Sequence, residues 1–335
     1  MMITITETTR KDFDAAAARA NVTLPIEQTA EWVRYQAGIS GRSPWRQDKG
    51  GCLLIQEDGT TVAFATFIDF ETHGYHYLRS AHGPAWIAKP TEQEESEAAD
   101  ALAAFVKEHD KRVVFLRISL WNELPQSCAT LSIVPYDQTV VIDVTDGDDG
   151  ILARMKSRGR RDVRKALREC PAECADETEQ ATESFADYYD VMVETGKRDS
   201  FAPAPMSDYA DMIRALAPDH VRVFAARIDG VVNAWSIITV NGTHAVRYYA
   251  AMRSDAMRLH ITDKLLYSEC CELGRQGITE YDLMGIGDDF APSLKGLNEF
   301  KTKFTKEITP VAPDRDVPIR KTFYKALTAA KKIRG

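Results

Sequence analysis

Two segments of the chain share a pattern in which β-rich apolar runs flank an Asp-Gly pair. In the first segment the runs 52–56 and 61–70 surround Asp58-Gly59, and in the second the runs 221–228 and 231–240 surround Asp229-Gly230. Asp-Gly between two such runs is a strong signal of a β-hairpin, because the turn needs a left-handed backbone that these residues tolerate. We therefore predict one hairpin in each half of the chain.

The same order of elements follows each predicted hairpin: a third strand, then a helix, then a buried strand. The expected segments are 75–79, 93–108 and 112–118 in the first half, and 243–251, 260–275 and 278–284 in the second. A repeated order of this kind predicts an α/β fold with mixed (α+β) sheets that arose by internal duplication of one unit. The alternative is that mixed α/β domains share this order by chance.

The stretch 297–304, LNEFKTKF, combines two aromatic residues with two lysines. Phe300 and Phe304 are four residues apart, so on a helix they share one face that packs into a core. Lys301 and Lys303 then point away from that face toward a cleft, where a lysine fixed by buried rings suits an oxyanion or a phosphate. The alternative, which the pattern alone favours, is a solvated charge pair on an amphipathic helix.

Charge is unevenly distributed along the chain. The net charge of −8 argues against a general nucleic-acid coat, yet eight of the residues 151–169 are Lys or Arg. This local basic patch fits a polyanion, and a solvated linker helix explains it equally well. A second basic stretch, 318–334, has apolar residues on one helical side, so it either docks on the first domain or rests on an anionic membrane. Its narrow apolar stripe favours docking.

Length and composition set further limits. The 335 residues allow two domains with separate cores. No apolar run reaches the length of a membrane span, and the first residues lack the layout of a signal peptide. The six cysteines show no metal-ligand spacing, so we expect reduced thiols in a cytoplasmic protein.

Several well-known catalytic motifs are missing. The sequence has no Walker loop, no GxGxxG after a strand, no HExxH and no GxSxG. The seven histidines form no metal-spaced pair on a helix, so we expect no metal. An enzyme with this sequence would work by positioning and electrostatics rather than through a covalent nucleophile.

Four more polar residues are candidates for a cleft. Arg198 follows a helix within a stretch, ETGKRDSF, that indicates an ordered turn. Arg247 and Tyr249 share one face of the expected strand 246–251. Asp282 ends a buried strand, where a charge usually faces a cleft or caps a turn.

With seven short motifs the chain resembles the FemABX peptidyltransferases, which are aminoacyl-tRNA-dependent ligases that build the interpeptide bridge of peptidoglycan. The motifs follow the family's order and cover nearly the whole chain. They are QTAEW (28–32), HGP (82–84), MKSRGRRDVRKALRE (155–169), ETGKRDSF (194–201), RYYAAM (247–252), YDLMGI (281–286) and LNEFKTKF (297–304).

The resemblance implies two tandem GNAT-like domains, with the second inserted in the first and a C-terminal helix that returns to the first. We expect a precursor-binding domain at 1–150 plus 315–335 and a domain at 151–314 that binds the end of the aminoacyl-tRNA. No heptad run for a coiled-coil arm is present, so the chain is similar to the compact FemX form.

The resemblance also implies a reaction. An aminoacyl group moves from the 3′ end of tRNA to the side-chain amine of the third stem-peptide residue in lipid II or UDP-MurNAc-pentapeptide, as a step of cell-wall biogenesis and cell-shape maintenance. An activated ester meets an amine, so no cofactor, ATP or metal is required. The expected protein is a cytoplasmic monomer, with peripheral contact at the inner membrane face left open.

The motifs assign roles to named residues by resemblance. Lys301 aligns with the family's catalytic lysine and would stabilise the tetrahedral oxyanion or orient the tRNA terminus. The residues assigned to tRNA are Arg158, Arg160, Arg161, Arg164, Phe300 and Lys303, and those assigned to the acceptor are Arg34, Gln36, Arg198, Arg247, Tyr249 and Asp282.

The chain departs from the family pattern at four places. Gln36 stands where the family has a lysine for the precursor's diphosphate, and Arg34 is a candidate substitute. Arg247 replaces a tyrosine, Ser119 replaces an acidic residue, and an arginine is missing from 204–206. A lipid-linked acceptor, presented differently from the soluble nucleotide, would fit these changes.

Two other functions remain as alternatives. One is a different GNAT-type acyltransferase that uses acyl-CoA or serves natural-product assembly from aminoacyl-tRNA, although the segment 252–256 has none of the glycines of a pyrophosphate loop. The other is a non-catalytic RNA-binding scaffold, which would explain the basic patch without chemistry.

Overall fold

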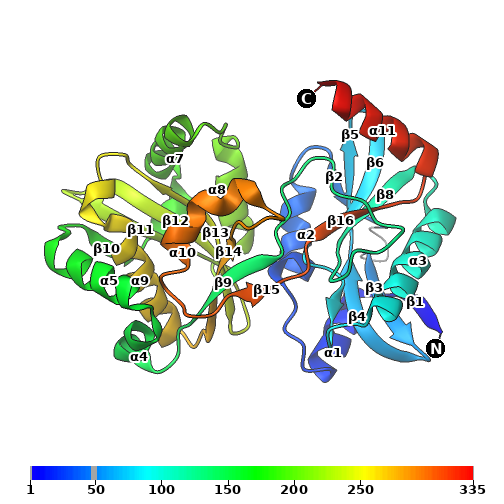
Figure 1. Cartoon of the computed structure of the whole chain (residues 1–335), viewed down its shortest axis with the longest axis horizontal. Helices are drawn as coiled ribbons and strands as arrows, with labels where there is room; N and C mark the ends of the chain where they lie inside the picture. Colours follow the sequence, from blue (N-terminus) through cyan, green and yellow to red (C-terminus); the bar gives the residue numbers. More distant parts are fainter. Residues whose placement is uncertain (1, 47–50, 335) are drawn as a thin grey trace. The chain divides into compact units, whose positions relative to one another are not determined.

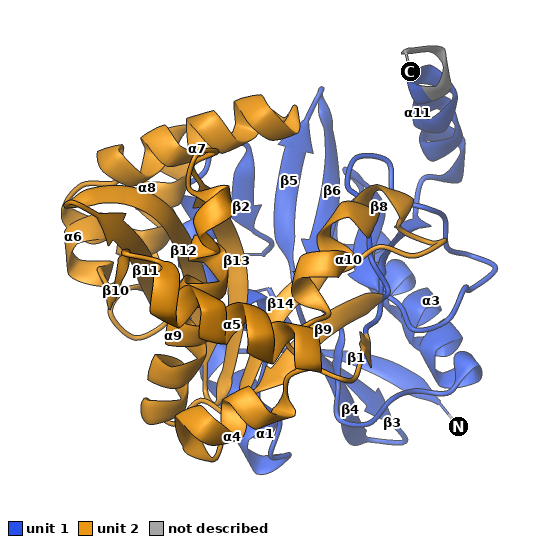
Figure 2. Ribbon diagram, turned by 60° about the vertical axis from the view of Figure 1, so that its left-hand side comes forward, with its two compact units in different colours: residues 1–137, 311–335 blue, residues 138–310 orange. Residues whose placement is uncertain are grey.

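The computed structural model describes residues 2–46 and 51–334, with side chains up to Lys331 (Figure 1). The chain forms two compact units, of which unit 1 comprises Met1–Asp137 and Val311–Gly335 and unit 2 comprises Gln138–Pro310 (Figure 2). Unit 2 is therefore inserted in unit 1. The first division falls after Asp137 rather than at residue 150, because the strand that follows pairs within the sheet of unit 2.

Unit 1 contains two sheets. The first has the order β1-β3-β4-β7 and the second the order β16-β8-β6-β5-β2. The strands are β1 (Ile3–Thr8), β2 (Arg42–Pro44), β3 (Cys52–Glu57), β4 (Thr60–Thr66), β5 (Ile68–Thr72), β6 (Tyr75–Ser80), β7 (Ala85–Trp86), β8 (Val113–Ser119) and β16 (Asp314–Pro318). Among the strand pairs described in unit 1, β6 and β8 run parallel and the others are antiparallel.

The helices of unit 1 pack beside these sheets. They are α1 (Arg10–Arg19), a 3-10 turn η1 (Ile26–Gln28), α2 (Ala30–Ala37), α3 (Glu92–His109) and α11 (Lys321–Arg334). Helix α3 begins with a capping box, in which the side chains of Thr91 and Glu94 each accept from the other's backbone N–H. Helix α11 docks on unit 1 through buried Tyr324, which packs against Phe115 of β8, so the predicted docking is confirmed.

Unit 2 is built on one seven-stranded sheet with the order β10-β11-β12-β13-β14-β9-β15. The strands are β9 (Gln138–Asp143), β10 (Glu173–Asp176), β11 (Val221–Ile228), β12 (Val231–Asn241), β13 (His244–Met252), β14 (Glu280–Gly285) and β15 (Thr309–Pro310). The helices are α4 (Gly147–Arg154), α5 (Ser157–Glu169), α6 (Thr178–Glu183), α7 (Ala186–Asp199), α8 (Met206–Leu216), α9 (Ile261–Arg275) and α10 (Lys295–Lys301), with 3-10 turns η3 (Met257–Leu259) and η4 (Pro292–Leu294). Only β13 and β14 run parallel among the strand pairs described in this sheet.

Both predicted Asp-Gly hairpins are present. Asp58 and Gly59 have φ values of 46° and 85°, and Asp229 and Gly230 have 49° and 78°. Both residues of each pair therefore adopt the left-handed backbone of the tight turns that connect twisted strands. The turns join β3 to β4 and β11 to β12.

The two units repeat one arrangement, which confirms the predicted duplicated α/β fold. In unit 1 the chain passes from β6 through α3 to β8, and in unit 2 from β13 through α9 to β14. In each unit these two strands form the parallel pair, and an antiparallel strand, β16 or β9, lies on its far side. No helix in the described part of the chain combines the length and the apolarity needed to cross a bilayer.

Candidate active site

The parallel strands β13 and β14 of unit 2 are paired over only three residues and then separate. They pair only at His244↔Glu280, Ala245↔Tyr281 and Val246↔Asp282, while β13 continues to Met252. Strand β14 then carries an extra residue relative to β9, and Met284 takes a left-handed backbone with φ of 62°. Bulges and left-handed non-glycine residues are costly and concentrate at functional sites. The end of β14 is therefore a candidate for the functional site of unit 2.

Lys301, the last residue of α10, reaches this bulge. Its Nζ donates to the carbonyl oxygens of Met284 at 3.2 Å and of Gly285 at 2.8 Å. No carboxylate among the residues that the structure describes lies within ion-pair distance of this ammonium. Two neutral carbonyls orient the cation and leave its charge uncompensated, as a stabiliser of a developing anion requires.

Aromatic side chains on both sides of Lys301 in the sequence pack into the core and hold its backbone in place. Phe304 is buried, and Phe300 packs on the same core with its ring edge-to-face against Phe304 at 5.2 Å. The prediction that these two rings share one buried face is confirmed. Phe304 lies beyond the end of the helix, because α10 ends at Lys301.

A side-chain amide ties α10 to the segment after β14. The N–H of Gly287 donates to Oδ1 of Asn298 at 2.8 Å, and Nδ2 of Asn298 donates to the carbonyl of Gly287 at 2.6 Å. A Cβ on Gly287 would lie 2.1 Å from the backbone nitrogen of Lys295, so this close approach requires glycine. The sequence pattern did not single out Asn298, which holds the Lys301 helix against the bulge.

Burial lowers the pKa of Lys301 to about 8, and the positive charge of Arg247 acts in the same direction, while Asp282 opposes them. Arg247 is itself almost buried, with Nε 3.1 Å from Oε2 of Glu269. Glu269 also accepts from Tyr281 Oη and Ser236 Oγ, each at 2.6 Å. Arg247 therefore influences the site through its charge, from within a closed polar network.

Asp282 shapes the bulge. Its Oδ1 accepts from the backbone N–H of Met284 at 2.6 Å and from the hydroxyl of Thr139 on β9. This contact caps the turn in which Met284 adopts its left-handed backbone. Asp282 thus supports the backbone whose carbonyls hold Lys301.

Lys303 corrects one expectation, because it does not face a cleft. It is 7% exposed, and its Nζ lies 3.3 Å from Oδ2 of Asp162 on α5 and in closer contact with Asp263 on α9. The rings of Phe300 and Phe304 lie 5.2 and 5.3 Å from the ammonium. A buried, doubly paired lysine is not available to an RNA phosphate, so Lys303 joins three segments of unit 2 instead.

Helix α5 carries the basic patch. Arg161 is 73% exposed, and Arg164 is exposed as well. Arg158 pairs with Glu299 and with Asp162, and Arg160 donates to the backbone carbonyls of Ala153 and Met155. The outward basic face therefore consists of Arg161 and Arg164 together with two residues that the sequence pattern had not assigned to a site, Lys165 and Arg168.

Comparison with known proteins relates the fold of the chain to acyltransferases. Residues 157–301, which include α5 and Lys301, match the family model of the acetyltransferase (GNAT) domain. No curated protein sequence matches the chain. The crystal structure of FemX superposes with a TM-score of 0.73 at 15% identity, over 96% of this chain and 99% of that one. This chain has the FemX fold.

Two more solved structures share the FemX-like fold. The C-terminal domain of a putative lysylphosphatidylglycerol synthetase from Agrobacterium fabrum has a TM-score of 0.55 at 16% identity and covers 92% of each chain. A tandem GNAT protein from the clavulanic acid biosynthesis pathway has a TM-score of 0.51 at 10% identity, over 95% of this chain and 98% of that one. The FemX and GNAT matches together support an acyltransferase of the Fem and GNAT type.

The FemX-like unit 2 also contains Arg198 and Tyr249. The Arg198 Nη1 donates to the carbonyl of Met252, at the end of β13, at 2.7 Å, and its other nitrogens pair with Asp199. The ring of Tyr249 is half-buried on β13 and stacks edge-to-face with Tyr209 at 5.0 Å. Tyr249 lies on the part of β13 that extends beyond its pairing with β14, and Arg198, in the last turn of α7, binds the end of that part.

In unit 1 the predicted acceptor residues Arg34 and Gln36 differ sharply. Arg34 is 68% exposed and pairs only loosely with Glu31, at 3.6 Å. Gln36 is buried, and its Oε1 accepts from Nη1 of Arg42 at 2.8 Å. A cation from β2 therefore stands beside the position where the FemABX pattern has a lysine. Arg42 was missed because it lies outside the motif, and only the fold brings it to Gln36.

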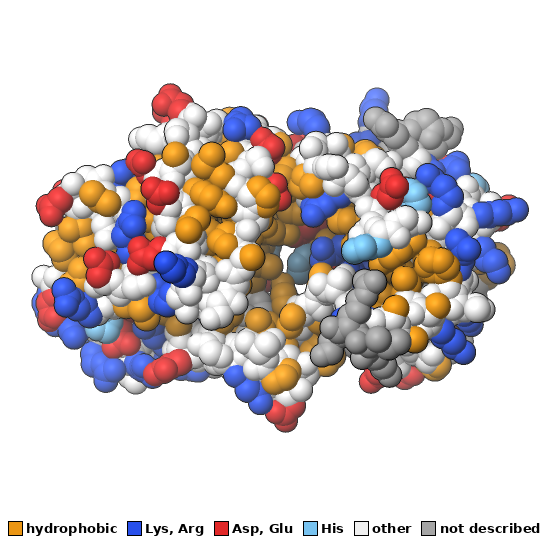
Figure 3. Space-filling model, turned by 90° about the horizontal axis from the view of Figure 1, so that it is seen from above, with side chains coloured by type: hydrophobic (Ala, Val, Ile, Leu, Met, Phe, Trp, Pro, Cys, Tyr) orange, Lys and Arg blue, Asp and Glu red, His pale blue; other side chains and the backbone are white. Residues whose placement is uncertain are grey.

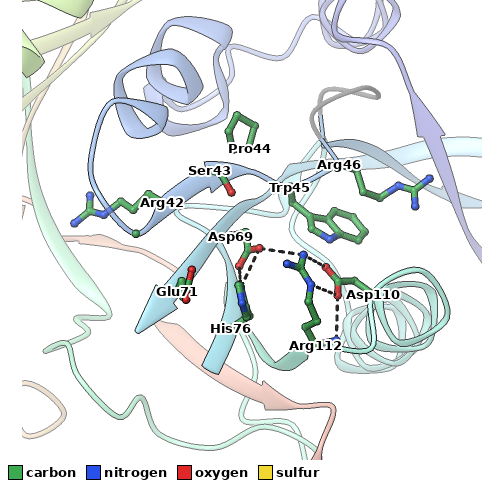
Figure 4. Close-up of a pocket in the computed structure, with 11 residues that line it drawn as sticks. Arg42, Ser43, Pro44, Trp45, Arg46, Asp69, Glu71, His76, Asp110 and Arg112 are labelled. Atoms are coloured by element: carbon green, nitrogen blue, oxygen red, sulfur yellow. Dashed lines mark hydrogen bonds and ion pairs between the residues drawn. The ribbon is translucent and has the colours of Figure 1, made fainter. Parts of the chain in front are cut away.

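Arg42 also lines a cavity of about 440 Å³ within unit 1 (Figure 4). The floor is a chain of paired side chains: His76 Nδ1 is 3.0 Å from Asp69, and Arg112 bridges Asp69 at 3.5 Å and Asp110 at 2.8 Å. Arg42 makes no ion pair with any residue the structure describes, and its guanidinium rests on the ring of Phe70 at 4.9 Å. Of the three lining arginines it is thus the one without an ion pair to a described residue, and Figure 4 shows its guanidinium turned away from the paired groups.

Among the described residues, no three His, Cys, Asp or Glu side chains cluster as metal ligands would. In unit 2 the bulge of β14 orients one cation, Lys301 of α10, and the same unit carries the basic helix α5.

Proposed function

We propose that the protein transfers an aminoacyl group from aminoacyl-tRNA to the side-chain amine of the third stem-peptide residue of a peptidoglycan precursor. The observation that carries the proposal is Lys301, an oriented and uncompensated ammonium at the bulge of β14, inside the segment that matches the GNAT domain. The FemX fold supports the resemblance to the FemABX family, and that resemblance makes this acceptor class the first to test.

The proposed chemistry needs only an amine and an activated ester. The amine nitrogen attacks the ester carbonyl, and a tetrahedral oxyanion forms. The C–N bond is then complete, the bond to the terminal ribose oxygen breaks, and the proton of the amine passes to that oxygen. Lys301 stabilises the oxyanion, a contribution of about 3–4 kcal/mol when a single preorganised donor supplies it.

The exposed face of α5 is the proposed contact for tRNA. Arg161, Arg164, Lys165 and Arg168 project from one helix and would bind phosphates in a salt-dependent way. Gly159 places this helix, because a Cβ there would lie 2.3 Å from the carbonyl oxygen of Lys303. The RNA-binding helix and the segment that carries Lys301 are therefore in direct backbone contact.

For the acceptor we propose that Arg42, rather than Arg34, replaces the lysine of the FemABX pattern and binds the diphosphate. The support is its contact with Gln36 and the absence of an ion pair among described residues. A lipid-linked acceptor is favoured over the soluble nucleotide. One structural neighbour is named a putative lysylphosphatidylglycerol synthetase, a name that joins an amino acid to a phospholipid. The protein would then act in the cytoplasm, at the inner membrane face.

An acyl-CoA donor is the second candidate, because the matching family model describes acetyltransferases. One contact disfavours it. In the turn after β13, the backbone N–H of Ser254 donates to Oε1 of Glu194 at 2.7 Å, and Arg253 pairs with the same carboxylate. A carboxylate thus occupies a backbone donor that a pyrophosphate would need at this turn.

A single-turnover assay decides among these functions. Purified protein is mixed with labelled aminoacyl-tRNA and either lipid II or UDP-MurNAc-pentapeptide, and separately with acetyl-CoA in a thermal-shift titration. We expect transfer from tRNA to the muramyl peptide and no stabilisation by acetyl-CoA. Binding of tRNA without any transfer would instead indicate a non-catalytic scaffold, and stabilisation by acetyl-CoA would indicate a CoA-dependent enzyme.

A further inference from the structure

Helix α11 of unit 1 is basic in an acidic protein. The segment 318–335 contains six Lys or Arg residues and no Asp or Glu, whereas the whole chain has a net charge of −8. Acidic and basic side chains are interspersed over the face of the molecule that Figure 3 displays. A segment with charges of one sign alone therefore differs from its surroundings.

Most of the described part of α11 is exposed. Tyr324 is its only buried side chain up to Lys331, and the Tyr324 hydroxyl donates to Oδ2 of Asp316 at 2.9 Å. Leu327 packs partly against the same core. The exposed residues of α11 are basic, apolar or uncharged polar: Lys321, Thr322, Phe323, Lys325, Ala326, Ala329, Ala330 and Lys331, with Arg320 just before the helix. Of these, Lys331 donates to the carbonyl of Leu131.

This composition does not serve the stability of the helix. Lys321 and Lys325 are four residues apart and repel each other. Lys321 also lies in the first turn, where the helix dipole disfavours a cation and no acidic residue is present. A short helix with one buried side chain gains little from packing. An anionic partner would relieve each of these costs.

We propose that the exposed face of α11 binds an anionic phospholipid surface. The basic residues match the negative headgroups, as juxtamembrane polybasic helices do. Phe323 is 37% exposed, and the guanidinium of Arg320 lies over its ring at 5.1 Å. An exposed aromatic ring among basic and alanine side chains suits the boundary between headgroups and acyl chains. The face of α5 lacks an aromatic residue, which fits RNA phosphates better.

The inference deepens the proposed function and rests on it for its purpose, because a lipid-linked acceptor is presented at such a surface. Lipid binding is measured without any catalytic turnover. Failure of lipid binding by α11 can therefore be distinguished from failure of the proposed aminoacyl transfer. Transfer to a water-soluble acceptor does not require α11.

The test is co-sedimentation with vesicles. Wild-type protein and the triple variant Arg320→Gln, Lys321→Gln, Lys325→Gln are mixed with phosphatidylcholine vesicles with or without phosphatidylglycerol, at low and high salt. Each basic residue near an anionic surface contributes about fivefold to binding, so the variant should bind the anionic vesicles ~100-fold more weakly. Binding by the wild type should require phosphatidylglycerol and fall at high salt. Circular dichroism and thermal unfolding check that the variant stays folded.

A matched control removes three charges from the other basic helix, through Arg161→Gln, Arg164→Gln and Arg168→Gln. We expect this control to keep vesicle binding and to lose tRNA affinity, and the α11 variant to do the reverse. The inference is overturned if the wild type ignores anionic vesicles, if both variants lose vesicle binding equally, or if the α11 variant loses tRNA affinity instead.

Discussion

The two units place a cation on or beside the same parallel strand pair, but they treat its charge in opposite ways. In unit 1, Arg117 on β8 is buried, and its Nε and Nη2 donate to Asp316 at 2.7 and 3.0 Å. Tyr324 adds a third contact to the same carboxylate. In unit 2, Lys301 is held at the end of β14 by two carbonyl oxygens and by no described carboxylate.

The parallel strand pairs of the two units also differ in how far they stay paired. Strands β6 and β8 remain paired as far as Ser80↔Ile118, whereas β13 and β14 separate after Val246↔Asp282. In unit 1 the pair is closed and its cation neutralised, which suits a structural role. In unit 2 the strands part, and the cation has no carboxylate partner among the described residues. The two copies of one duplicated scaffold thus treat this cation differently: unit 1 balances its charge internally, and unit 2 is the copy for which we propose chemistry.

Breaking the charge balance of unit 1 should have the largest effect on stability. Asp316→Ala leaves the Arg117 guanidinium buried without its partner, and we expect the free energy of unfolding to fall by about 3–5 kcal/mol. Denaturant titration measures the loss. The control is Glu299→Ala, which removes an exposed ion pair with Arg158 and should change the free energy of unfolding far less. Equal losses for the two variants would contradict the contrast between closed and exposed pairs.

Lys303 extends the comparison of the two units, because this lysine of unit 2 is buried and paired with carboxylates, as Arg117 is in unit 1. Lys303→Met would leave Asp162 and Asp263 buried together, and the free energy of unfolding at pH 7 should fall by roughly 3 kcal/mol, with partial rescue by Lys303→Arg. Burial raises the pKa of Asp162, but Lys303 and Arg161 outweigh it and hold that pKa below its usual value. This stabilisation is present above the ordinary pKa of an aspartate and is lost as the pH falls through the lowered value.

The measurement for Lys303 is therefore denaturant unfolding of wild type and variant from pH 3 to pH 7. We expect the difference between them to shrink toward the acid end. A difference that is constant over this range would mean that packing, and not the ion pairs, makes Lys303 important.

The smallest effect is expected at the acceptor site of unit 1. Arg42→Gln should raise the KM for the muramyl acceptor by about 10- to 100-fold and leave kcat nearly unchanged, because a charged hydrogen bond to a diphosphate contributes roughly 1.5–3 kcal/mol and acts on binding. Arg34→Gln is the matched control and should change neither constant. If Arg34→Gln raised the KM as much as Arg42→Gln did, Arg34 would again be a candidate for binding the diphosphate, as the sequence suggested.

Features that depend on neighbouring residues could be predicted from the sequence. The Asp-Gly turns set their own backbone geometry, and Phe300 and Phe304 are spaced to share a face. The repeated order of strand, helix and strand gave the duplicated fold class correctly.

Features that depend on distant residues could not be predicted. The burial of Lys303 requires Asp162 and Asp263, which only the fold brings to it. The left-handed Met284 and its bulge arise where β14 meets β9, and no local signal marks them. Arg42 likewise reaches Gln36 only across the turn between α2 and β2.

The most direct test of the central claim is the pH dependence of the rate that Lys301 contributes. The single-turnover rate of transfer is measured from pH 6.5 to 9.5 for wild type and for Lys301→Met, and the ratio of the two is taken at each pH, so that deprotonation of the acceptor amine cancels. The variant should remain folded. In the folded protein the pKa of Lys301 is about 8, below the 10.5 of an unfolded lysine. The charged side chain therefore destabilises the folded state below pH 8, and this destabilisation disappears as the pH rises from 8 toward 10.5. Replacing Lys301 by Met thus removes a destabilising charge at neutral pH. We predict a ratio of about 10²–10³ near neutral pH that falls as the pH rises through about 8, because the cation is the active form. A ratio close to one at every pH, or one that rises through pH 8, would contradict the account.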